Sequence, residues 1–306
     1  MKHILLTGAT GFLGSHLLEA LLRQGYLVTI LKRSTSDTWR IKHLLDSVTA
    51  YDVDVQPLEE AFKPKKVDAV IHTACSYGKN RESVSGVYDS NVVFPLRIAE
   101  TAIQYNVQAF INTDSFFVKS GLPNGYMAPY VASKRHIWEC LRVFFPLLKV
   151  VNMRLEHVYG PNDNADKFVA WLSDQYINCS EERTKVQLSS CRQIRDFVSV
   201  YDVVKAYRQV LLNLDRIKSG VVYEVGSGIG TTVKEFVINL HNIFTDLNYA
   251  SVDLEFDSSR DRKGEIPKSV GDNYELKKIG WMPEVDLNRG ISELVMSKVR
   301  CHEKGM

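Results

Sequence analysis

The sequence contains few cysteines, and no two of them stand in a CxxC pair. The five cysteines among the 306 residues are Cys75, Cys140, Cys179, Cys191 and Cys301. An odd number of widely spaced cysteines predicts neither a disulfide framework nor a zinc site, and we expect no bound metal. Unpaired cysteines are typical of a reducing compartment, so the expected location is the cytoplasm.

Long apolar runs and blocks of like charge are also absent. No uninterrupted apolar segment approaches the roughly 20 residues that a membrane-spanning helix needs. The apolar stretch at the start ends at Gly8, which is too short for a signal peptide. The 38 basic and 36 acidic residues leave a net charge of +2, and no basic block interleaves with aromatic residues. We therefore expect binding to neither membranes nor nucleic acids.

What the chain does contain is a regular alternation of short apolar runs and longer helical patterns, without internal repeats or long Pro/Gly linkers. Strands are expected at 3–7, 27–31, 68–74, 109–113 and 149–153, and helices at 11–25, 37–45, 90–106 and 130–145. This order predicts βαβ units, and hence an α/β protein with a doubly wound parallel sheet, the Rossmann fold. Ligands of such folds bind at the carboxyl ends of the strands.

The alternation loosens after about residue 155, which indicates a smaller C-terminal substrate-binding lobe. We expect the dinucleotide-binding domain to comprise residues 1–155, with residues 195–225 returning to it. Residues 156–194 and 226–306 then form the substrate-binding lobe. Because no linker separates the two parts, the lobe is expected to grow out of the first domain.

The segment "TGATGFLG", residues 7–14, follows the first expected strand and opens the first helix. Gly8, Gly11 and Gly14 permit a tight turn and a close approach of the backbone to a pyrophosphate, whose charge is favoured by a helix N-terminus. A glycine-rich turn that only caps the helix is the alternative. The position between a strand and a helix favours dinucleotide binding.

The end of the second expected strand carries Lys32, Arg33 and Ser34. Proteins that bind NAD often place an acidic residue here, which accepts hydrogen bonds from the ribose 2′-hydroxyl. A carboxylate would repel a 2′-phosphate, whereas an arginine binds one with two charge-assisted hydrogen bonds. The pattern predicts NADP(H) as the cofactor, unless the two cations are only exposed residues at a strand end.

The segment "YVASK" places Tyr130 and Lys134 four residues apart at a helix start, so both side chains share one face. A nearby ammonium favours the phenolate, so we expect Lys134 to lower the pKa of Tyr130. The strand before this helix ends at Ser115, whose hydroxyl can hydrogen-bond a substrate carbonyl or alcohol. A YxxxK spacing by itself is common, and its significance here comes from its position in the fold.

In this order, the glycine loop, Ser115 and the Tyr130–Lys134 pair resemble the extended short-chain dehydrogenase/reductase family. The family includes nucleotide-sugar epimerases, dehydratases and reductases. Further matching stretches are "RLEHVYGP" at 154–161, "RDFVSVYDVVKA" at 195–206 and "GDNYELKKIGWMPE" at 271–284, so the resemblance covers nearly the whole chain.

The resemblance implies roles for individual residues. The implied catalytic residues are Ser115, Tyr130 and Lys134. The implied cofactor-binding residues are Gly8, Thr10, Gly11, Phe12, Leu13, Gly14, Lys32, Arg33, Ser34, Asp52, Val53, Ala74, Asn91, Tyr130, Lys134 and His157. Among them, the resemblance implies that Asp52 and Val53 bind the adenine and that Asn91 supports Lys134. The implied substrate-binding residues are Cys75, Ser115, Lys167, Arg195 and Arg262, with the two arginines on the sugar-nucleotide diphosphate. His72 is expected to be structural or to lie beside the cofactor.

One departure from the family narrows the reaction. Sugar 4,6-dehydratases of the family carry an acidic pair directly after the catalytic hydroxyl residue, whereas Phe116 and Phe117 follow Ser115 here. Phenylalanine cannot carry a proton, so dehydration is disfavoured. Asp114 precedes the serine and is expected to point to the opposite face of the strand.

Several stretches, among them "HTACSYGKNRES", are similar to bacterial CDP-sugar 4-ketoreductases, the CDP-paratose and CDP-abequose synthases of O-antigen biosynthesis. The resemblance implies NADPH-dependent reduction of the C4 ketone of a CDP-4-keto-3,6-dideoxyhexose. Alternatives are a nucleotide-sugar 4-epimerase with tightly bound NAD and a non-catalytic NADP-binding sensor of the same fold. By the same resemblance, helices near 87–106 and 127–146 would pair two copies into a homodimer.

Overall fold

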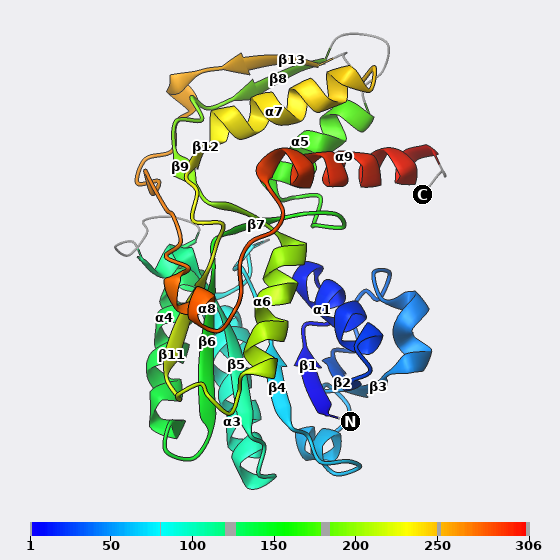
Figure 1. The fold of residues 1–306 in the computed structure, drawn as a ribbon, viewed down its shortest axis with the longest axis vertical. Coiled ribbons are helices and arrows are strands. Elements are labelled where there is room, and N and C mark those ends of the chain that lie inside the picture. Colours follow the sequence, from blue (N-terminus) through cyan, green and yellow to red (C-terminus); the bar gives the residue numbers. More distant parts are fainter. Residues whose placement is uncertain (1, 80, 120–126, 179–183, 250–251, 304–306) are drawn as a thin grey trace. The chain divides into compact units, whose positions relative to one another are not determined.

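The computed structural model describes residues 2–79, 81–119, 127–178, 184–249 and 252–303 (Figure 1). The chain divides into two compact units, each described by itself below. Unit 1 comprises Met1–Leu155, Val204–Glu224 and Lys278–Gly280, and unit 2 comprises Glu156–Val203, Val225–Lys277 and Trp281–Met306. No helix within the described ranges combines the length and the apolar character that crossing a bilayer requires.

Unit 1 is built around a seven-stranded sheet, counted over the described residues. In spatial order its strands are β11 (Val221–Val225), β6 (Lys149–Leu155), β5 (Ala109–Ser115), β4 (Ala69–His72), β1 (His3–Thr7), β2 (Leu27–Lys32) and β3 (Thr49–Asp52). Each neighbouring pair from β6 to β3 is parallel. The strand order reverses at β1 and β4, and such a switch point is where open α/β sheets bind ligands.

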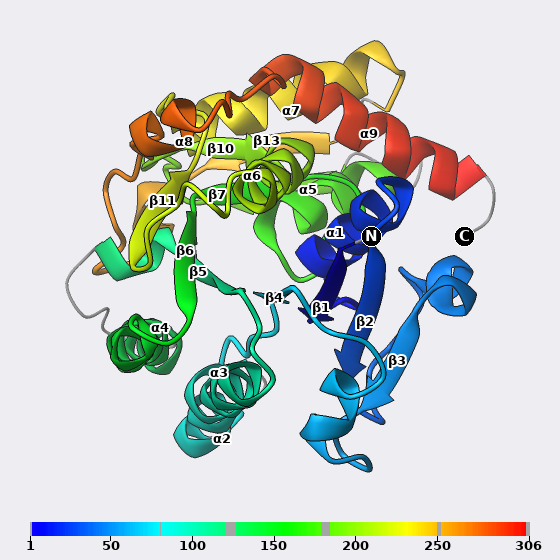
Figure 2. The same cartoon turned by 60° about the horizontal axis from the view of Figure 1, so that its bottom comes forward.

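Helices cover both faces of this sheet. They are α1 (Phe12–Arg23), α2 (Val84–Tyr88), α3 (Phe94–Gln104), α4 (Ala128–Leu141) and the part of α6 (Val200–Leu212) from Val204 onward. Figure 2 shows α3 and α4 on one side of the strands and α1 on the other. The core under α3 and α4 is made by apolar residues of both layers, among them Ile98, Ala102, Ile137, Leu141, Val70, Phe110 and Val150. The predicted doubly wound fold is therefore confirmed.

The helix predicted at 37–45 is wrong. The chain there forms only a short 3-10 helix, Lys42–Ser47, before β3, and none of that helix's residues is buried. Ile41 is the only buried residue of 37–45, and a segment with so little buried surface lacks most of the tertiary contacts that stabilise protein helices. Elsewhere in unit 1, short 3-10 helices at Leu58–Phe62, Phe116–Lys119 and Arg142–Phe144 and a π-helical turn at Asp89–Val93 complete the described structure.

Unit 2 combines three helices with short strand pairs. The helices are α5 (Phe168–Ile177), α7 (Val233–Asp246) and α9 (Leu287–Glu303), together with most of the short α8 (Tyr274–Lys278) and a 3-10 turn at Ser258–Arg260. The strand pairs are β7 (His157–Tyr159) with β10 (Phe197–Ser199), β9 (Ile194–Arg195) with β12 (Thr231–Thr232), and β8 (Thr184–Leu188) with β13 (Val252–Phe256). Thr232 caps α7 by accepting from the Glu235 N–H, and Glu235 accepts in return from the Thr232 N–H.

The boundary of the returning segment differs from the sequence-based division. Residues 195–203 were assigned with 195–225 to the first domain, yet in the structure they belong to unit 2. The reason is strand pairing, because β9 and β10 hydrogen-bond to β12 and β7. Only the stretch from Val204 to Glu224 joins unit 1.

The close packing of helix α9 in unit 2 predicts that a side chain at Gly290 destabilises the fold. A Cβ atom added to this buried glycine would lie 2.0 Å from the Tyr159 hydroxyl, and Tyr159 is itself buried. We expect Gly290→Ala to cost about 1 to 3 kcal/mol through overpacking and to lower the thermal unfolding midpoint. Asn288→Ala, at an exposed position of the same helix, is the control. Equal midpoints for the two variants would contradict this packing.

Candidate active site

The glycine loop connects β1 to α1 in unit 1 and leaves no room for side chains. Gly8 has a φ of +69°, and a Cβ atom there would lie 2.6 Å from the Ala74 backbone N. A Cβ atom on Gly14 would lie 2.0 Å from the Gly8 carbonyl O. Gly11, the N-cap residue of α1, has no side chain that could cap the first-turn N–H groups of the helix. This cradle fits the pyrophosphate of a dinucleotide, which approaches bare backbone at a helix N-terminus.

His72 supports the start of this loop from β4. Its Nδ1 hydrogen-bonds the Thr7 hydroxyl at 2.8 Å, and the same hydroxyl accepts from the Ala74 N–H at 3.2 Å. Burial, with a smaller contribution from the charge of Lys134, lowers the pKa of His72 to about 3. These contacts of a neutral, buried histidine are structural, which is one of the two roles expected for His72. Through the Thr7 hydroxyl, His72 helps to hold Ala74 beside the glycine loop.

At the end of β2, the predicted cation Lys32 lies beside a carboxylate of the neighbouring strand β3, Asp52. Lys32 Nζ lies 3.5 Å from Asp52 Oδ2, and the Ser34 hydroxyl donates to the same oxygen at 2.8 Å. The Ser34 hydrogen bond is the largest cause that holds the pKa of Asp52 below its usual range, with Lys32 adding to it. Val53 lies alongside, since its N–H donates to the Lys32 carbonyl at 2.9 Å. The predicted ribose and adenine residues are thus brought together, and Asp52 offsets part of the positive charge of Lys32.

Arg40 is a cofactor-side residue that the sequence reasoning missed. Its Nη1 donates to the Thr10 carbonyl of the glycine loop at 3.2 Å, and its guanidinium lies 4.4 Å from the centre of the Trp39 ring. A guanidinium stacked on an aromatic ring keeps its charge and its orientation. The only signal in the sequence was the Trp-Arg dipeptide in a segment predicted to be helical. Arg33, by contrast, is exposed, and its backbone N–H donates to Ser36.

Tyr130 and Ser115 are both buried, with 4% and 8% of their surface exposed, and Ser115 is close enough to Tyr130 to influence its pKa. Burial, together with the nearby Cys75 and the charge of Asp114, raises the pKa of Tyr130 well above its usual value of 10.0, while Ser115 acts in the opposite direction. The expected lowering of the Tyr130 pKa is therefore wrong for this state, because desolvation of the phenolate outweighs the opposing influence of Ser115.

Lys134 lies in the same site but is oriented toward the strand. Its Nζ donates to the Thr113 carbonyl at 2.7 Å and lies 6.0 Å from the centre of the Tyr130 ring. The predicted support by Asn91 is indirect. The Asn91 amide donates to the Ser76 carbonyl at 2.8 Å and to the Ser133 hydroxyl at 2.9 Å, and Ser133 directly precedes the lysine.

Aromatic rings surround the phenol of Tyr130. Tyr77 stacks on it with ring centres 4.9 Å apart, and Phe117 meets it edge-on at 6.4 Å. Phe117 also stacks on the buried Phe116 at 4.3 Å. Cys75 is close enough to influence Tyr130 electrostatically, and its predicted place at the substrate stays a prediction. Among the described residues, the ring contacts of the phenol are thus aromatic, with Ser115, Cys75 and Lys134 as polar neighbours.

The remaining predicted residues belong to unit 2. His157 packs edge-on against Phe197 at 4.9 Å, and burial, with the charges of Arg195 and Lys167, lowers the pKa of His157 to about 4. Arg195 is buried and donates to the Ile266 carbonyl at 2.7 Å and to Glu265 at 3.1 Å. A diphosphate would have to compete with Glu265 for this guanidinium. Arg262 is exposed.

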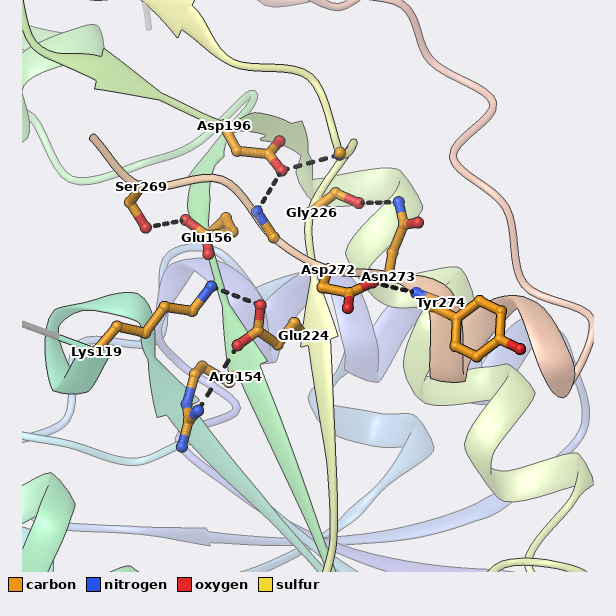
Figure 3. A network of polar contacts seen from close by, with 12 residues as sticks. Lys119, Arg154, Glu156, Asp196, Glu224, Gly226, Ser269, Asp272, Asn273 and Tyr274 are labelled. Atoms are coloured by element: carbon orange, nitrogen blue, oxygen red, sulfur yellow. Dashed lines mark hydrogen bonds and ion pairs between the residues drawn. The ribbon is translucent and has the colours of Figure 1, made fainter.

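A buried carboxylate organises the loops around this part of unit 2. Asp196 accepts hydrogen bonds from the Ser227 N–H and hydroxyl and from the N–H groups of Gly228 and Gly271. Figure 3 shows Asp196 near Gly226 and, next to it, the Glu156 carboxylate accepting from Ser269. A Cβ atom on Gly226 would lie 2.3 Å from Asp196 Oδ2, so only glycine fits there. Residues 226–228, which directly follow β11, thus form a loop fixed by one buried acid.

Comparison with known proteins identifies the family. The model of the NAD dependent epimerase/dehydratase family matches residues 4–226. The chain belongs to this family. It is 36% identical over 302 residues to CDP-abequose synthase of Salmonella typhimurium, covering 96% of this chain and 97% of the relative. It is 32% identical to CDP-abequose synthase of Salmonella muenchen, covering 97% and 98%.

Solved structures of the family share the fold over the whole chain. UDP-glucose-4-epimerase from Stenotrophomonas maltophila, with bound NAD and formylated UDP-arabinopyranose, superimposes with a TM-score of 0.85 at 20% identity and covers 100% of both chains. Thermus thermophilus UDP-glucose 4-epimerase in complex with NAD gives a TM-score of 0.80 at 25% identity, covering 97% of this chain and 99% of that one. The Rossmann-like assignment from the sequence is confirmed.

The glycine cradle predicts a specific loss of dinucleotide binding. Gly8→Ala places a methyl group against the Ala74 backbone, whereas Gly25 has a similar φ of +77° with nothing within 4 Å of an added Cβ. Both substitutions carry the backbone strain of a left-handed residue, about 1 to 2 kcal/mol. We expect only Gly8→Ala to weaken NADPH binding, by 10-fold or more, as measured by the change in NADPH fluorescence. Equal affinities of the two variants would refute the cradle.

Proposed function

We propose that this protein reduces the C4 ketone of a nucleotide-diphosphate 4-keto-deoxyhexose with NADPH. The proposed substrate is CDP-4-keto-3,6-dideoxyglucose, and the product is CDP-paratose or CDP-abequose, sugars of O-antigen biosynthesis. Two relatives named CDP-abequose synthase, at 36% and 32% identity over nearly their full length, support this substrate class. The reaction type is supported by the site itself.

The observation that carries the proposal is the state of Tyr130. Its phenol is buried, and burial raises its pKa well above the usual value of 10.0, so it is protonated near neutral pH. A ketone that gains a hydride develops negative charge on its oxygen and needs a proton there. In this proposal Tyr130 donates the proton, and the Ser115 hydroxyl orients the oxygen beside it.

The surroundings of the serine argue against water elimination. That reaction needs an acid and a base beside the sugar ring, and the two residues after Ser115 are the stacked Phe116 and Phe117. The acid before the serine, Asp114, is directed to β6, where it accepts hydrogen bonds from Asn152 and Arg154. A site with one protonated phenol and apolar walls suits proton donation to a single oxygen.

The cofactor in this proposal is NADP(H), which supplies the hydride when bound. The glycine loop would hold the pyrophosphate, and Lys32, Arg33 and Ser34 would hold the 2′-phosphate. Arg40, which is tied to Thr10 of the loop, adds a guanidinium on the same side of unit 1. Lys134 would anchor the nicotinamide ribose. His157, Lys167, Arg195 and Arg262 stay assigned to the nicotinamide and the sugar nucleotide.

A second candidate is a nucleotide-sugar 4-epimerase with tightly bound NAD. It is favoured by Asp52, a carboxylate at the end of β3 that lies beside Lys32, because carboxylates accept from a free ribose 2′-hydroxyl. Related epimerase structures also contain bound NAD. A non-catalytic sensor of the same fold is the least supported reading, since the chain retains both Tyr130 and Lys134.

The deciding experiment incubates the purified protein with CDP-4-keto-3,6-dideoxyglucose and NADPH and follows absorbance at 340 nm. The proposal predicts one NADPH consumed per sugar reduced, and a slower reaction with NADH. An epimerase would release NAD on denaturation and would need no added cofactor. Turnover without added cofactor, or no loss of absorbance with any 4-ketosugar nucleotide, would reject the reductase.

Tyr130→Phe tests the proton donor. The variant retains the ring and its stacking on Tyr77 but lacks the hydroxyl. We expect kcat to fall about 100-fold or more, as loss of a general acid predicts. NADPH affinity should stay unchanged, because the phenol is needed for the proton and not for the pyrophosphate. Tyr88→Phe, which removes an exposed hydroxyl that bonds His136, is the control and should keep wild-type kcat.

The pH dependence follows from the same pKa shift. The reduction requires the phenol, so the rate should stay level while the pH lies below the raised pKa of Tyr130 and fall only as the pH passes through it. We therefore expect no loss of kcat attributable to Tyr130 between pH 6 and pH 9. A basic limb with a midpoint near pH 7 in wild-type protein would contradict a buried, protonated phenol.

A further inference from the structure

Four charged side chains of unit 1 form a chain of ion pairs around the end of β5, referred to below as the ion chain. Arg154 Nε lies 3.0 Å from Asp114 Oδ2, and Arg154 Nη1 lies 3.7 Å from Glu224 Oε1. Lys119 Nζ lies 2.6 Å from Glu224 Oε2. Figure 3 shows Lys119 and Arg154 converging on Glu224. The ion chain therefore links β5, β6, β11 and the 3-10 turn that follows Ser115.

Asp114 is the buried member of the ion chain. Its side chain is 1% exposed, against 20% for Arg154 and 21% for Glu224. Its Oδ1 accepts from the Ser115 N–H at 2.8 Å, and its Oδ2 accepts from Asn152 at 2.9 Å and from Arg154 Nε at 3.0 Å. A buried carboxylate is tolerated only when hydrogen bonds and a counter-charge compensate for its lost hydration. These contacts fix the carboxylate of Asp114. Because the Ser115 N–H donates to that carboxylate, they also fix the backbone of Ser115.

Asn112 extends the network across the sheet. Its amide donates to Asn152 Oδ1 at 2.7 Å, and Asn152 in turn donates to Asp114. Both asparagines are buried and face each other in the β5–β6 register. Asp114 is therefore held from one side by a charged partner and from the other by a buried amide pair.

The ion chain brackets the residues that contact Tyr130. Asp114 directly precedes Ser115, and Lys119 ends the turn that contains Phe117. We propose that Asp114 is a positioning residue, which fixes Ser115 and the following turn against the phenol of Tyr130 through Arg154 and Glu224. This assignment rests on the proposed reductase function, in which Ser115 and Tyr130 act on one substrate oxygen. The negative charge of Asp114 also contributes to the raised pKa of Tyr130.

Asp114→Asn changes the network with little change in shape. An asparagine has one acceptor oxygen in place of two, so its NH₂ group would face a donor, either the Ser115 N–H or the Asn152 and Arg154 side chains. A partner left without its acceptor has to shift or remain unsatisfied. Small displacements of catalytic groups can cost about 100-fold in rate. We expect kcat to fall 10- to 100-fold while the KM for NADPH stays within twofold of wild type.

Two control variants separate positioning from stability. Asp215→Asn makes the same chemical change in unit 1, at a carboxylate that accepts from Gln108 at 2.8 Å. Val150→Ala removes a buried side chain on β6 and should lower the melting midpoint without touching the ion chain. Both controls should retain wild-type kcat at temperatures well below melting. A kcat for Asp114→Asn within twofold of wild type, or a loss that Val150→Ala reproduces at an equal melting midpoint, would overturn the proposal.

Hydrogen exchange of the substrate-free protein supplies a readout that does not depend on the reaction. Peptides that cover residues 113–119 should exchange at least fivefold faster in Asp114→Asn than in wild type, and at the wild-type rate in Asp215→Asn. Unchanged exchange in Asp114→Asn would overturn the positioning role even if the reductase assay succeeds. If wild type reduces no ketosugar while exchange rises as expected, the proposed function fails and the structural role of Asp114 stands.

Discussion

The burial of Tyr130 beside Ser115 is the constraint on which the proposed chemistry depends. Burial makes the phenolate unfavourable, and the pKa of Tyr130 is raised as a result. The phenol is then a hydrogen donor beside a second hydroxyl, which is what a developing alkoxide needs. The neutral state of Tyr130 follows from its surroundings, Tyr77 and Phe117, as much as from its sequence neighbours.

Ser115 and Tyr130 are positioned by a strand end and by a helix start, respectively. Ser115 closes β5, where Asp114 ties it to β6, and Tyr130 lies in the first turn of α4. The glycine loop follows β1, and His72 on β4 holds its first residue. Polar side chains at these strand ends are buried and paired with each other, so the functional groups are fixed by the sheet. This arrangement explains why a chain with an ordinary apolar core places so many polar residues at one edge of it.

Much of unit 1 could be predicted because its signals are local. The glycine spacing, the strand-to-helix alternation and the YxxxK spacing each depend on a few neighbouring residues, and the fold and the proximity of Ser115 to Tyr130 follow from them. The helix at 37–45 was wrong because only Ile41 of this segment is buried, and no local pattern reveals how much of a helix face will be packed. Arg40 and the pairing of Lys32 with Asp52 were missed for the same reason, since both depend on contacts between segments far apart in sequence. The predicted lowering of the Tyr130 pKa was wrong because the burial that raises it cannot be predicted from the Tyr130–Lys134 spacing.

The central claim, that Tyr130 is held protonated, is tested most directly by titrating its phenol. Ultraviolet difference spectra of wild type against Tyr130→Phe, recorded on substrate-free protein as the pH is raised, isolate this one phenolate among the 14 tyrosines. The account predicts that no phenolate assigned to Tyr130 appears below pH 10, because burial raises its pKa above the usual value of 10.0. A phenolate that appears with a midpoint near neutral pH would contradict it.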